Sequence, residues 1–214
     1  DYPRYNVPKL PPGKKIPIPP GPRVAPGTYQ LQVKFRDHRD SSTFKVLPDP
    51  RTPYNAEAIA AREAMISEFM RYGKAATEGF SRLRDVRNMV GDAEKALKNA
   101  DKAVRDSLMK ESKVIRDSIK TLMHVYLAPE NSTGIDAVTR RLSDAYWRTG
   151  SYLRRSSRPG GNAELAMSQF KGKVEAVLQR INRFLNEDWK AFREKVEAAQ
   201  KPLFKEVEDV KLDE

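Results

Sequence analysis

The chain has 214 residues, of which 39% are hydrophobic and 32% are charged, a balance that suits one or two soluble, helix-rich domains. It contains no cysteine, which excludes disulfides, thiolate metal sites and cysteine nucleophiles. The two histidines, His38 and His124, fall in different predicted elements and form no helical pair for zinc or haem, so no cofactor is expected.

Positive charge is concentrated at the start of the chain. Residues 1–53 hold ten Lys/Arg against four Asp/Glu, whereas the rest of the chain holds 30 against 25. Nine prolines in residues 1–27 exclude a helix or a central strand there. We expect an extended basic arm, with Lys14, Lys15 and Arg23 as candidate contacts. A solvated linker, an arm on a protein partner, an SH3-type ligand, and an arm on nucleic acid or anionic lipid headgroups all stay open.

The first residues, Asp1 to Tyr5, lack the apolar segment of a signal peptide. No apolar run approaches the roughly 20 residues that a membrane span needs. Two interpretations follow: a targeting segment was removed before this form, or the chain was never exported.

A β-hairpin is predicted next. Pro26-Gly27 suits a type II turn, and the apolar residues Tyr29, Leu31, Val33 and Phe35 then alternate with polar ones, which is typical of a half-buried strand. Residues 37–42 read as a polar loop and residues 43–47 as the return strand. Because two strands alone are marginal in water, we expect cover from the missing strands of a β-sandwich or, alternatively, from the helices.

A long helix is predicted from an N-cap at Asn55 to about Asn99 or Ala100. Small and apolar residues recur there at steps of three, four and seven, which places them on one seam: Ile66, Phe69, Gly73, Ala76, Phe80, Leu83, Val90, Leu97 and Val104. Gly91 lies off the seam and is a candidate kink. A coiled-coil dimer also fits such a seam, but further amphipathic segments in the same chain favour intramolecular packing.

The remaining helices follow between two breaks. The second helix presents Val104, Leu108, Ile115, Ile119, Leu122 and Tyr126 on one face. After the break at residues 128–134, a third helix is expected from about Ile135, and after a break at residues 155–161, Asn162 is expected to cap the last one. The seam of that last helix holds Met167, Phe170, Val174, Val177, Ile181, Phe184, Phe192, Val196, Ala199 and Leu203.

These elements predict a mainly α fold: an antiparallel bundle of about four helices, preceded by a proline-rich arm and a β-hairpin from an incomplete β-sandwich. The expected division is residues 1–53 for the arm and a partial Ig-like β unit, residues 54–204 for the bundle, and residues 205–214 for an acidic tail that frays.

The order of these features resembles a known family. Pro26-Gly27-Thr28-Tyr29, the alternating strand, Asp49-Pro50-Arg51 and then the helices, including residues 122–127 and Gly134-Ile135, are similar to the C-terminal region of large secreted bacterial proteins with sortilin-like, BNR-repeat β-propellers. The resemblance covers about residues 20–203. It implies an Ig-like sandwich joined to a helical tail, and export to the periplasm, the outer-membrane surface or the medium. The family's glycosidase label rests on propeller repeats that this chain lacks, so no catalytic residue is carried over.

One basic and aromatic cluster stands out near the third helix. Its members are Arg140, Arg141, Arg148, Arg154, Arg155 and Arg158, with Tyr146, Trp147 and Tyr152. Guanidinium groups for phosphate and rings for base stacking suit single-stranded nucleic acid. The same arginines suit carboxylates of a protein partner, and a solvated helix face is the third interpretation.

No acid–base pair stands out. Glu187 and Asp188 are adjacent, so on a helix they point about 100° apart. Trp189 beside Phe192 suits packing better than a sugar platform. Gly160-Gly161-Asn162 before a helix suits a helix breaker better than an anion site.

Three functions are therefore carried forward. The first is a non-catalytic structural and protein-interaction module that docks to upstream domains of a parent chain or to a partner complex at the cell surface. The second is a nucleic-acid-binding protein that uses the arm and the arginine cluster. The third is the accessory tail of a glycoside hydrolase whose active site lies outside this sequence.

Overall fold

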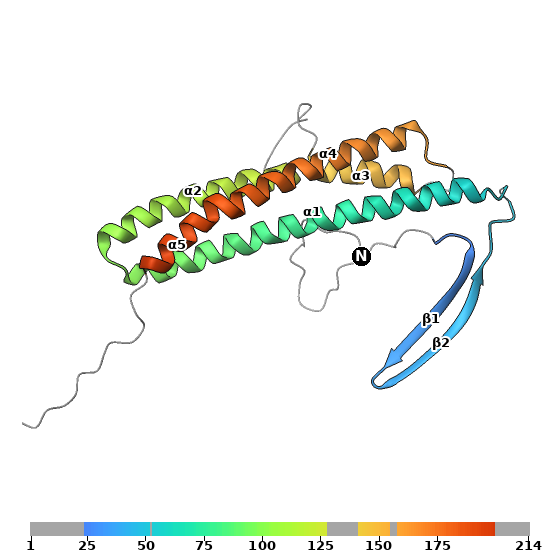
Figure 1. Cartoon of the computed structure of the whole chain (residues 1–214), viewed down its shortest axis with the longest axis horizontal. Coiled ribbons are helices and arrows are strands. Elements are labelled where there is room, and N and C mark those ends of the chain that lie inside the picture. Colours follow the sequence, from blue (N-terminus) through green and yellow to red (C-terminus); the bar gives the residue numbers. More distant parts are fainter. Residues whose placement is uncertain (1–23, 52, 128–140, 155–157, 200–214) are drawn as a thin grey trace, which may run out of the picture. The chain divides into compact units, whose positions relative to one another are not determined.

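The computed structural model describes residues 24–51, 53–127, 141–154 and 158–199. Two strands, β1 (Gly27–Phe35) and β2 (His38–Val46), precede the helices α1 (Ala56–Ala96), α2 (Lys102–Tyr126), α3 (Leu142–Leu153), α4 (Gly161–Phe184) and α5 (Lys190–Ala199). A 3-10 turn, Leu97–Asn99, follows α1, and a π-helical segment, Leu185–Trp189, links α4 to α5 (Figure 1). The prediction of a mainly α chain with a hairpin before about four helices is confirmed.

The hairpin is longer than predicted. Its strands pair antiparallel from Gly27↔Val46 to Phe35↔His38, which leaves Arg36 and Asp37 as a two-residue turn. The predicted loop at residues 37–42 is therefore wrong. The predicted type II turn is wrong too, because Gly27 already pairs within β1. Arg36 has φ of 53°, as two-residue hairpin turns require.

The start of α1 agrees with the sequence. The Asn55 side-chain oxygen accepts a hydrogen bond from the Ala58 N–H at 2.9 Å, which satisfies one of the free donors of the first turn. The helix then continues through Gly91 without a break, and the kink predicted there stays a prediction.

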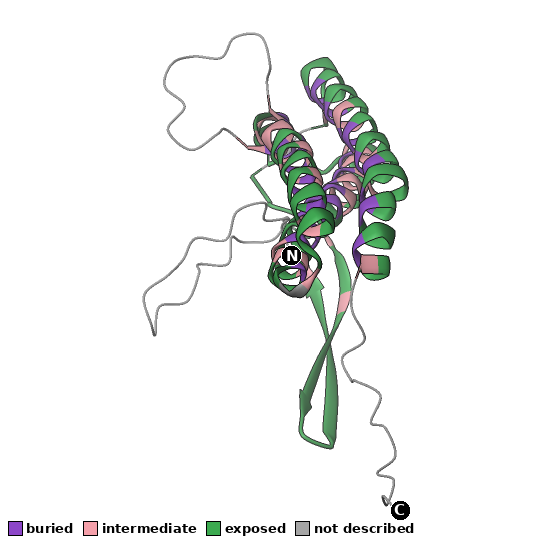
Figure 2. Cartoon of the chain, turned by 90° about the vertical axis from the view of Figure 1, so that its left-hand side faces the viewer, coloured by how far each residue is buried: buried purple, intermediate pink, exposed green. Residues whose placement is uncertain are grey.

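The predicted seam of α1 is buried along its length. Figure 2 shows buried residues, in purple, on the helices, whereas the hairpin is almost wholly exposed, in green. Val104, the last predicted member, is 42% exposed, so its assignment to the buried seam is wrong. It lies on α2, beyond the turn that ends α1, so its position no longer follows the phase of α1.

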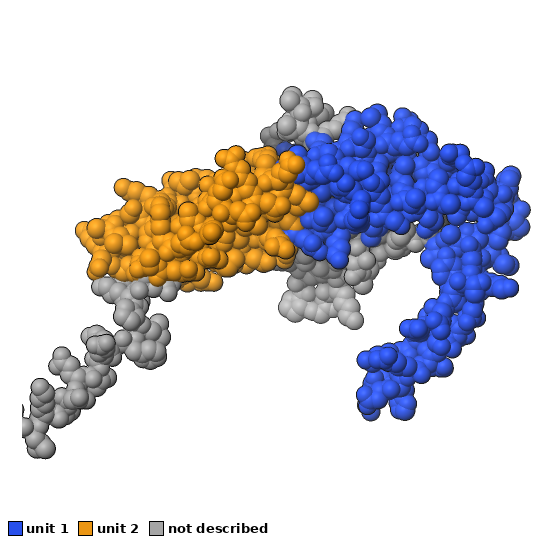
Figure 3. Space-filling model, in the orientation of Figure 1, with its two compact units in different colours: residues 1–78, 126–176 blue, residues 79–125, 177–214 orange. Residues whose placement is uncertain are grey.

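The chain divides into two compact units, which Figure 3 colours separately. Unit 1 comprises residues 1–78 and 126–176, and unit 2 comprises residues 79–125 and 177–214. The main helical segments of unit 1 are the first part of α1, α3 and the first part of α4. Those of unit 2 are the second part of α1, α2, the end of α4 and α5.

An aromatic cluster forms the centre of unit 1. The Phe69 ring lies 4.8 Å from the Tyr146 ring and 5.4 Å from the Phe170 ring, and all three side chains are buried. Thr149 is fully buried beside them, and its hydroxyl donates to the carbonyl oxygens of Ala145 and Ala166. These contacts join α3 and α4 to α1 by packing and by a satisfied polar group.

The core of unit 2 is aliphatic and aromatic. Its members are Phe80, Leu83, Val86, Val90 and Leu97 from residues 79–99, Leu108, Ile115, Ile119 and Leu122 from α2, and Val177, Ile181, Phe184, Trp189, Phe192 and Val196 from residues 177–199. The seam predicted for the last helix is thus buried from Met167 to Val196, whereas Leu203 lies outside the described residues.

The last helical stretch differs from the prediction in two places. It begins at Gly161, and the Gly160 carbonyl accepts hydrogen bonds from the N–H groups of Ala163 and Glu164, so the predicted cap at Asn162 is wrong. A π-helical segment at Leu185–Trp189 then shifts the helical phase, which brings Trp189 and Phe192 onto the buried side.

The third helix is described only from Leu142, and its predicted first residues, Ile135 and Val138, lie outside the described residues. The predicted boundaries of the arm, the bundle and the acidic tail stay predictions.

Candidate interaction surface

One face of the hairpin carries an uncovered apolar row along β1, with Phe44 and Val46 at one end of β2 and the polar residues Ser42, Asp40 and His38 along the rest of β2. Residues paired across the strands share a face, so Tyr29, Leu31, Val33 and Phe35 of β1 lie on the same side as Phe44 and Val46 of β2. Leu31 is 54% exposed, Val33 55%, Phe35 68% and Phe44 49%. The described part of the chain leaves this face open.

Local contacts order the hairpin. The Tyr29 hydroxyl donates to the carbonyl oxygen of Ala25 at 2.6 Å, and the Tyr29 ring stacks on the Phe44 ring with centroids 5.9 Å apart. At the turn, the Arg36 guanidinium lies 5.4 Å from the centre of the Phe35 ring. These contacts order the side chains at both ends of this face, and its middle holds Leu31 and Val33 of β1 opposite Ser42 and Asp40 of β2.

The opposite face of the hairpin is polar and basic. It carries Lys34 paired with Arg39 and Lys45 paired with Thr28, together with uncharged Gln30, Gln32, Ser41 and Thr43. All of these residues are exposed. The hairpin is therefore amphipathic: one face suits an apolar layer and the other suits water.

A bidentate ion pair follows the hairpin. The Arg51 guanidinium donates to both carboxylate oxygens of Asp49, at 2.9 and 2.8 Å. The hydrogen bonds from Arg51 lower the pKa of the Asp49 carboxyl below its usual value. Both side chains are largely exposed, so this pair orders the connection locally and contributes little to stability.

The structure separates the basic-aromatic cluster of the sequence. Lys14, Lys15, Arg23, Arg140 and Arg155 lie outside the described residues. Tyr146 is buried beside Phe69, whereas Trp147 is 58% exposed. The described members of the cluster therefore face both the core and the solvent.

The described arginines of this cluster have local roles. The backbone N–H of Arg141 donates to the Asp144 carboxylate at 3.2 Å, at the start of α3. Arg148 donates to the side-chain oxygen of Gln169 at 2.7 Å, which ties α3 to α4. Arg154 is exposed after α3, and Tyr152 is half-buried within it. Arg158 is exposed and forms an ion pair with Glu57 at 3.2 Å, so the described exposed members of the cluster are Trp147, Arg154 and Arg158.

Sequence reasoning missed a cluster that joins α1 to α4 in unit 1. Lys171 donates to the Glu68 carboxylate at 2.6 Å, and the Tyr72 hydroxyl donates to the Glu175 carboxylate at 2.7 Å. The hydrogen bond to Glu175 raises the pKa of the Tyr72 phenol. Each helix contributes two residues four positions apart, which places them on one face of that helix but does not identify their partners on the other helix.

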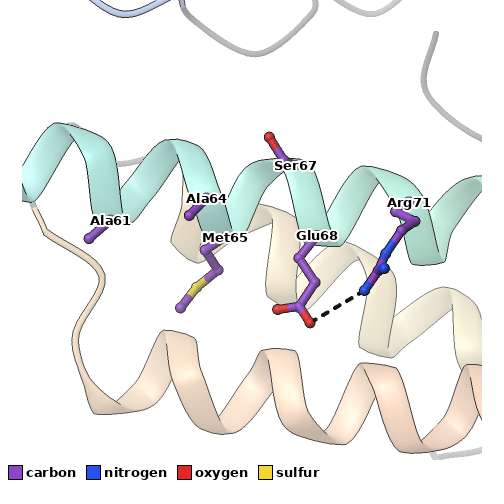
Figure 4. Close-up of a pocket in the computed structure, with 6 residues that line it drawn as sticks. All are labelled: Ala61, Ala64, Met65, Ser67, Glu68 and Arg71. Carbon is purple, nitrogen blue, oxygen red and sulfur yellow. Dashed lines mark ion pairs between the residues drawn. The ribbon is translucent and has the colours of Figure 1, made fainter.

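A shallow groove lies beside this cluster. Its lining on α1 consists of Ala61, Ala64, Met65, Ser67, Glu68 and Arg71 (Figure 4). In the close-up, Met65 and Glu68 point towards the neighbouring helix and Ser67 points away. Glu68 forms ion pairs with Arg71 at 3.9 Å and with Lys171 at 2.6 Å, so its charge is compensated. The groove lacks a nucleophile held by a base, and it suits interhelical packing better than chemistry.

A second interhelical contact lies in unit 2. Arg116 of α2 donates to both oxygens of Glu94 of α1, at 2.7 and 2.6 Å, and the Ser112 hydroxyl donates to Glu94 at 2.9 Å. The hydrogen bond from Arg116 lowers the pKa of the Glu94 carboxyl. Ser112 is buried and the Glu94 side chain is 22% exposed, so water screens this pair only in part.

The Glu94 pair predicts a pH-dependent stability. Because its folded-state pKa lies below the usual 4.5, the carboxylate stabilises the fold fully above that pH, and the contribution is lost as the pH falls through the folded-state pKa. Glu94→Gln should lower the free energy of unfolding at pH 7 by about 1 kcal/mol, a value already discounted for screening. Urea unfolding at several pH values measures the difference.

The matched control is Asp92→Asn. Asp92 also pairs with a cation, Lys95, at 2.7 Å, but its side chain is 73% exposed. We expect this substitution to change stability little at any pH. If Glu94→Gln lowers the free energy of unfolding by the same amount at acidic pH as at pH 7, the role given to the Glu94 carboxylate is wrong.

Two structural searches of the described residues were negative. Among residues 24–51, 53–127, 141–154 and 158–199, no group of three or more His, Asp or Glu residues could hold a metal ion. Among those same residues, no helix is long and apolar enough to cross a membrane. The chain also matches no protein-family model, no curated protein and no solved structure.

Proposed function

We propose that this chain is a non-catalytic structural and protein-interaction module that docks through its hairpin. The observation that carries the proposal is the apolar face of β1 and β2, on which Leu31, Val33 and Phe35 are each more than half exposed. A contiguous apolar face bordered by polar residues is typical of an interaction site. The hairpin alone is too small for independent stability, so docking would also stabilise the hairpin itself.

The proposed partner of the hairpin is a set of β-strands in the upstream part of a larger protein. The resemblance to exported sortilin-like propeller proteins supports this setting, because their Ig-like sandwich precedes a helical tail. In that setting the helices act as a rigid C-terminal support, and the hairpin completes the sandwich. The protein would then act at the cell surface, in the periplasm or in the medium.

The bundle supports a structural role. Its charged side chains are engaged across helices in the Glu68–Lys171 and Glu94–Arg116 pairs, at 2.6 Å in both cases. Its buried aromatic rings pack on one another in unit 1. These contacts hold helices together, and the charged and aromatic groups that make them are already engaged with one another rather than open to a substrate.

Nucleic-acid binding has narrower support. Among the described residues of the cluster, the exposed ones are the ring of Trp147 and the cations Arg154 and Arg158, and Arg158 already pairs with Glu57. Single-stranded nucleic acid needs a series of such groups along a groove. Binding of labelled single-stranded RNA that weakens steeply with salt would favour this second function over docking.

The deciding experiment compares this chain with the parent protein that encloses it. The parent reading frame is mapped, and the enclosing polypeptide is expressed beside the present chain. We expect the backbone amides of residues 27–46 to exchange hydrogen slowly in the longer protein and fast in the present chain, since docking buries the hairpin. Equally fast exchange in both proteins, or a reading frame without upstream strands, would contradict the proposal.

Two neighbouring substitutions sharpen this test. Val33 lies on the apolar face and Gln32 on the polar face, and both side chains are exposed in the present chain. In the longer protein, Val33→Lys should abolish the slow exchange, because it puts a charge into the docked layer. Gln32→Lys adds the same charge on the other face and should leave the slow exchange intact.

A further inference from the structure

The hydrogen bond of Tyr29 identifies the position of β1 in a sandwich. Tyr29 lies near the start of β1, and its hydroxyl donates at 2.6 Å to the carbonyl oxygen of Ala25, four residues upstream. A tyrosine with this backward hydrogen bond, the tyrosine corner, marks the start of the next-to-last strand in Greek-key sandwiches of the immunoglobulin type. That strand lies between the last strand and a strand from earlier in the fold. In such a sandwich, a strand with the geometry of Tyr29 has a neighbour on the side away from the last strand.

The side chains of the two strands agree with this position. On the apolar face, β1 carries Tyr29, Leu31, Val33 and Phe35 without interruption, which suits a strand covered along its length. On that same face β2 carries Asp40 opposite Val33 and His38 opposite Phe35. A charge that points inward is a common protection of a sheet edge against further pairing. The outer edge of β2 is thus protected, and the outer edge of β1 is not.

The backbone of β1 is available for pairing. The two-residue turn makes Phe35↔His38 the closing hydrogen-bonded pair, so the odd-numbered residues of β1 turn their N–H and C=O groups towards β2. The even-numbered residues, Thr28, Gln30, Gln32 and Lys34, turn theirs outward. Because the described sheet has only β1 and β2, no third strand within it pairs with these groups.

The charge along β1 restricts the incoming strand. The outward-facing residues of β1 are three uncharged residues and Lys34, with no acidic side chain among them. A strand that brings a lysine or arginine opposite Lys34 would place like charges together, whereas a carboxylate there would be favourable. The matching strand alternates apolar residues with uncharged or acidic ones.

We propose that the outer edge of β1 pairs with such a strand, supplied by an antiparallel sandwich that lacks its last two strands, and that β2 stays the outer edge of the completed sheet. This inference rests on the proposed docking function and adds which edge docks and what chemistry the partner strand has. The mode is strand addition: main-chain hydrogen bonds hold the strand, and the apolar alternation sets its register.

The test uses a synthetic strand as the probe. The peptide has the nine-residue length of β1, alternates threonine with valine, and carries glutamate at both ends of its polar face, so either orientation puts a carboxylate opposite Lys34. A peptide of the same composition with its valines consecutive is the control. Backbone amide hydrogen exchange in the whole chain is measured with each peptide at millimolar concentration.

The alternating peptide is expected to slow exchange at the outward amides of β1, those of Thr28, Gln30, Gln32 and Lys34. The outward amides of β2, those of Arg39, Ser41, Thr43 and Lys45, should stay fast. Slow exchange on β2 instead, equal slowing by the control peptide, or no slowing at all would overturn the assignment of the edge. Slow exchange of β1 without peptide, growing with protein concentration, would identify a second copy as the occupant and would overturn it too.

Two proline substitutions give a matched control at the edges. Gln32 and Ser41 pair directly across the hairpin, and each directs its N–H outward. Proline removes that N–H and leaves the hydrogen bonds between β1 and β2 in place. Gln32→Pro should weaken peptide binding about tenfold, the effect of one lost backbone hydrogen bond, and Ser41→Pro should leave it unchanged.

The resonances of the stacked Tyr29 and Phe44 rings report whether the hairpin of each variant stays intact. Weakened binding by Ser41→Pro alone, with intact hairpins, would assign docking to β2. The inference is then wrong while docking itself stands. The longer parent protein tests docking itself. If the hairpin exchanges fast there too, the docking function is wrong, whichever edge the peptide binds.

Discussion

Phe170→Ala is expected to lower the free energy of unfolding by about 3–5 kcal/mol, the usual effect of truncating a buried phenylalanine. Phe170 is fully buried on α4, and its ring lies 5.4 Å from that of Phe69 and 5.9 Å from that of Tyr146. The substitution removes the ring at which α1, α3 and α4 meet, and the neighbouring rings cannot close the cavity without leaving their own contacts. Urea unfolding followed by circular dichroism measures the change.

Leu165→Ala is the control on the same helix. Leu165 is 58% exposed, so its truncation leaves no cavity and should change stability by less than about 0.5 kcal/mol. If the two substitutions have equal effects, the buried side of α4 is assigned wrongly. If Phe170→Ala leaves the melting temperature unchanged, the aromatic cluster does not form the core of unit 1.

Leu83→Ala tests the core of unit 2 and should cost about 2–5 kcal/mol. Leu83 is fully buried on the second part of α1. Met89, on the same helix, is 45% exposed, so Met89→Ala should change stability little. Thermal unfolding of the two variants side by side separates the buried face of this helix from its exposed face. Similar melting temperatures for both would contradict the burial pattern of α1.

The contrast between the helices and the hairpin carries the functional conclusion. The helices bury their own seams, from Ile66 to Val196, and the ion pairs Glu68–Lys171 and Glu94–Arg116 join them. The hairpin has an equally regular apolar pattern, yet Leu31, Val33 and Phe35 stay more than half exposed. A pattern that the chain satisfies in one place and leaves open in another suggests a partner for the open part.

The alternation in β1 predicted its strand, and the steps of three and four predicted the buried seam of α1, because each secondary structure has a fixed side-chain period. The Asn55 cap was predicted from residue type alone and is formed. From its sequence, the polar half of β2 is predicted as a loop, because an edge strand whose side chains are exposed on both faces has no apolar alternation to detect. Val104 was placed on the seam because the period continued across a turn that resets the phase of the helix.

Local periodicity and capping are enough to predict most of the helices, the alternation of β1 and the apolar helix faces. Only the tertiary structure decided which polar groups meet, as Tyr72 does with Glu175 and Glu94 with Arg116 across helices. It also decided that Trp147 faces solvent while its neighbour Tyr146 is buried. Such pairings depend on how helices distant in sequence are rotated and spaced, and no local period encodes that.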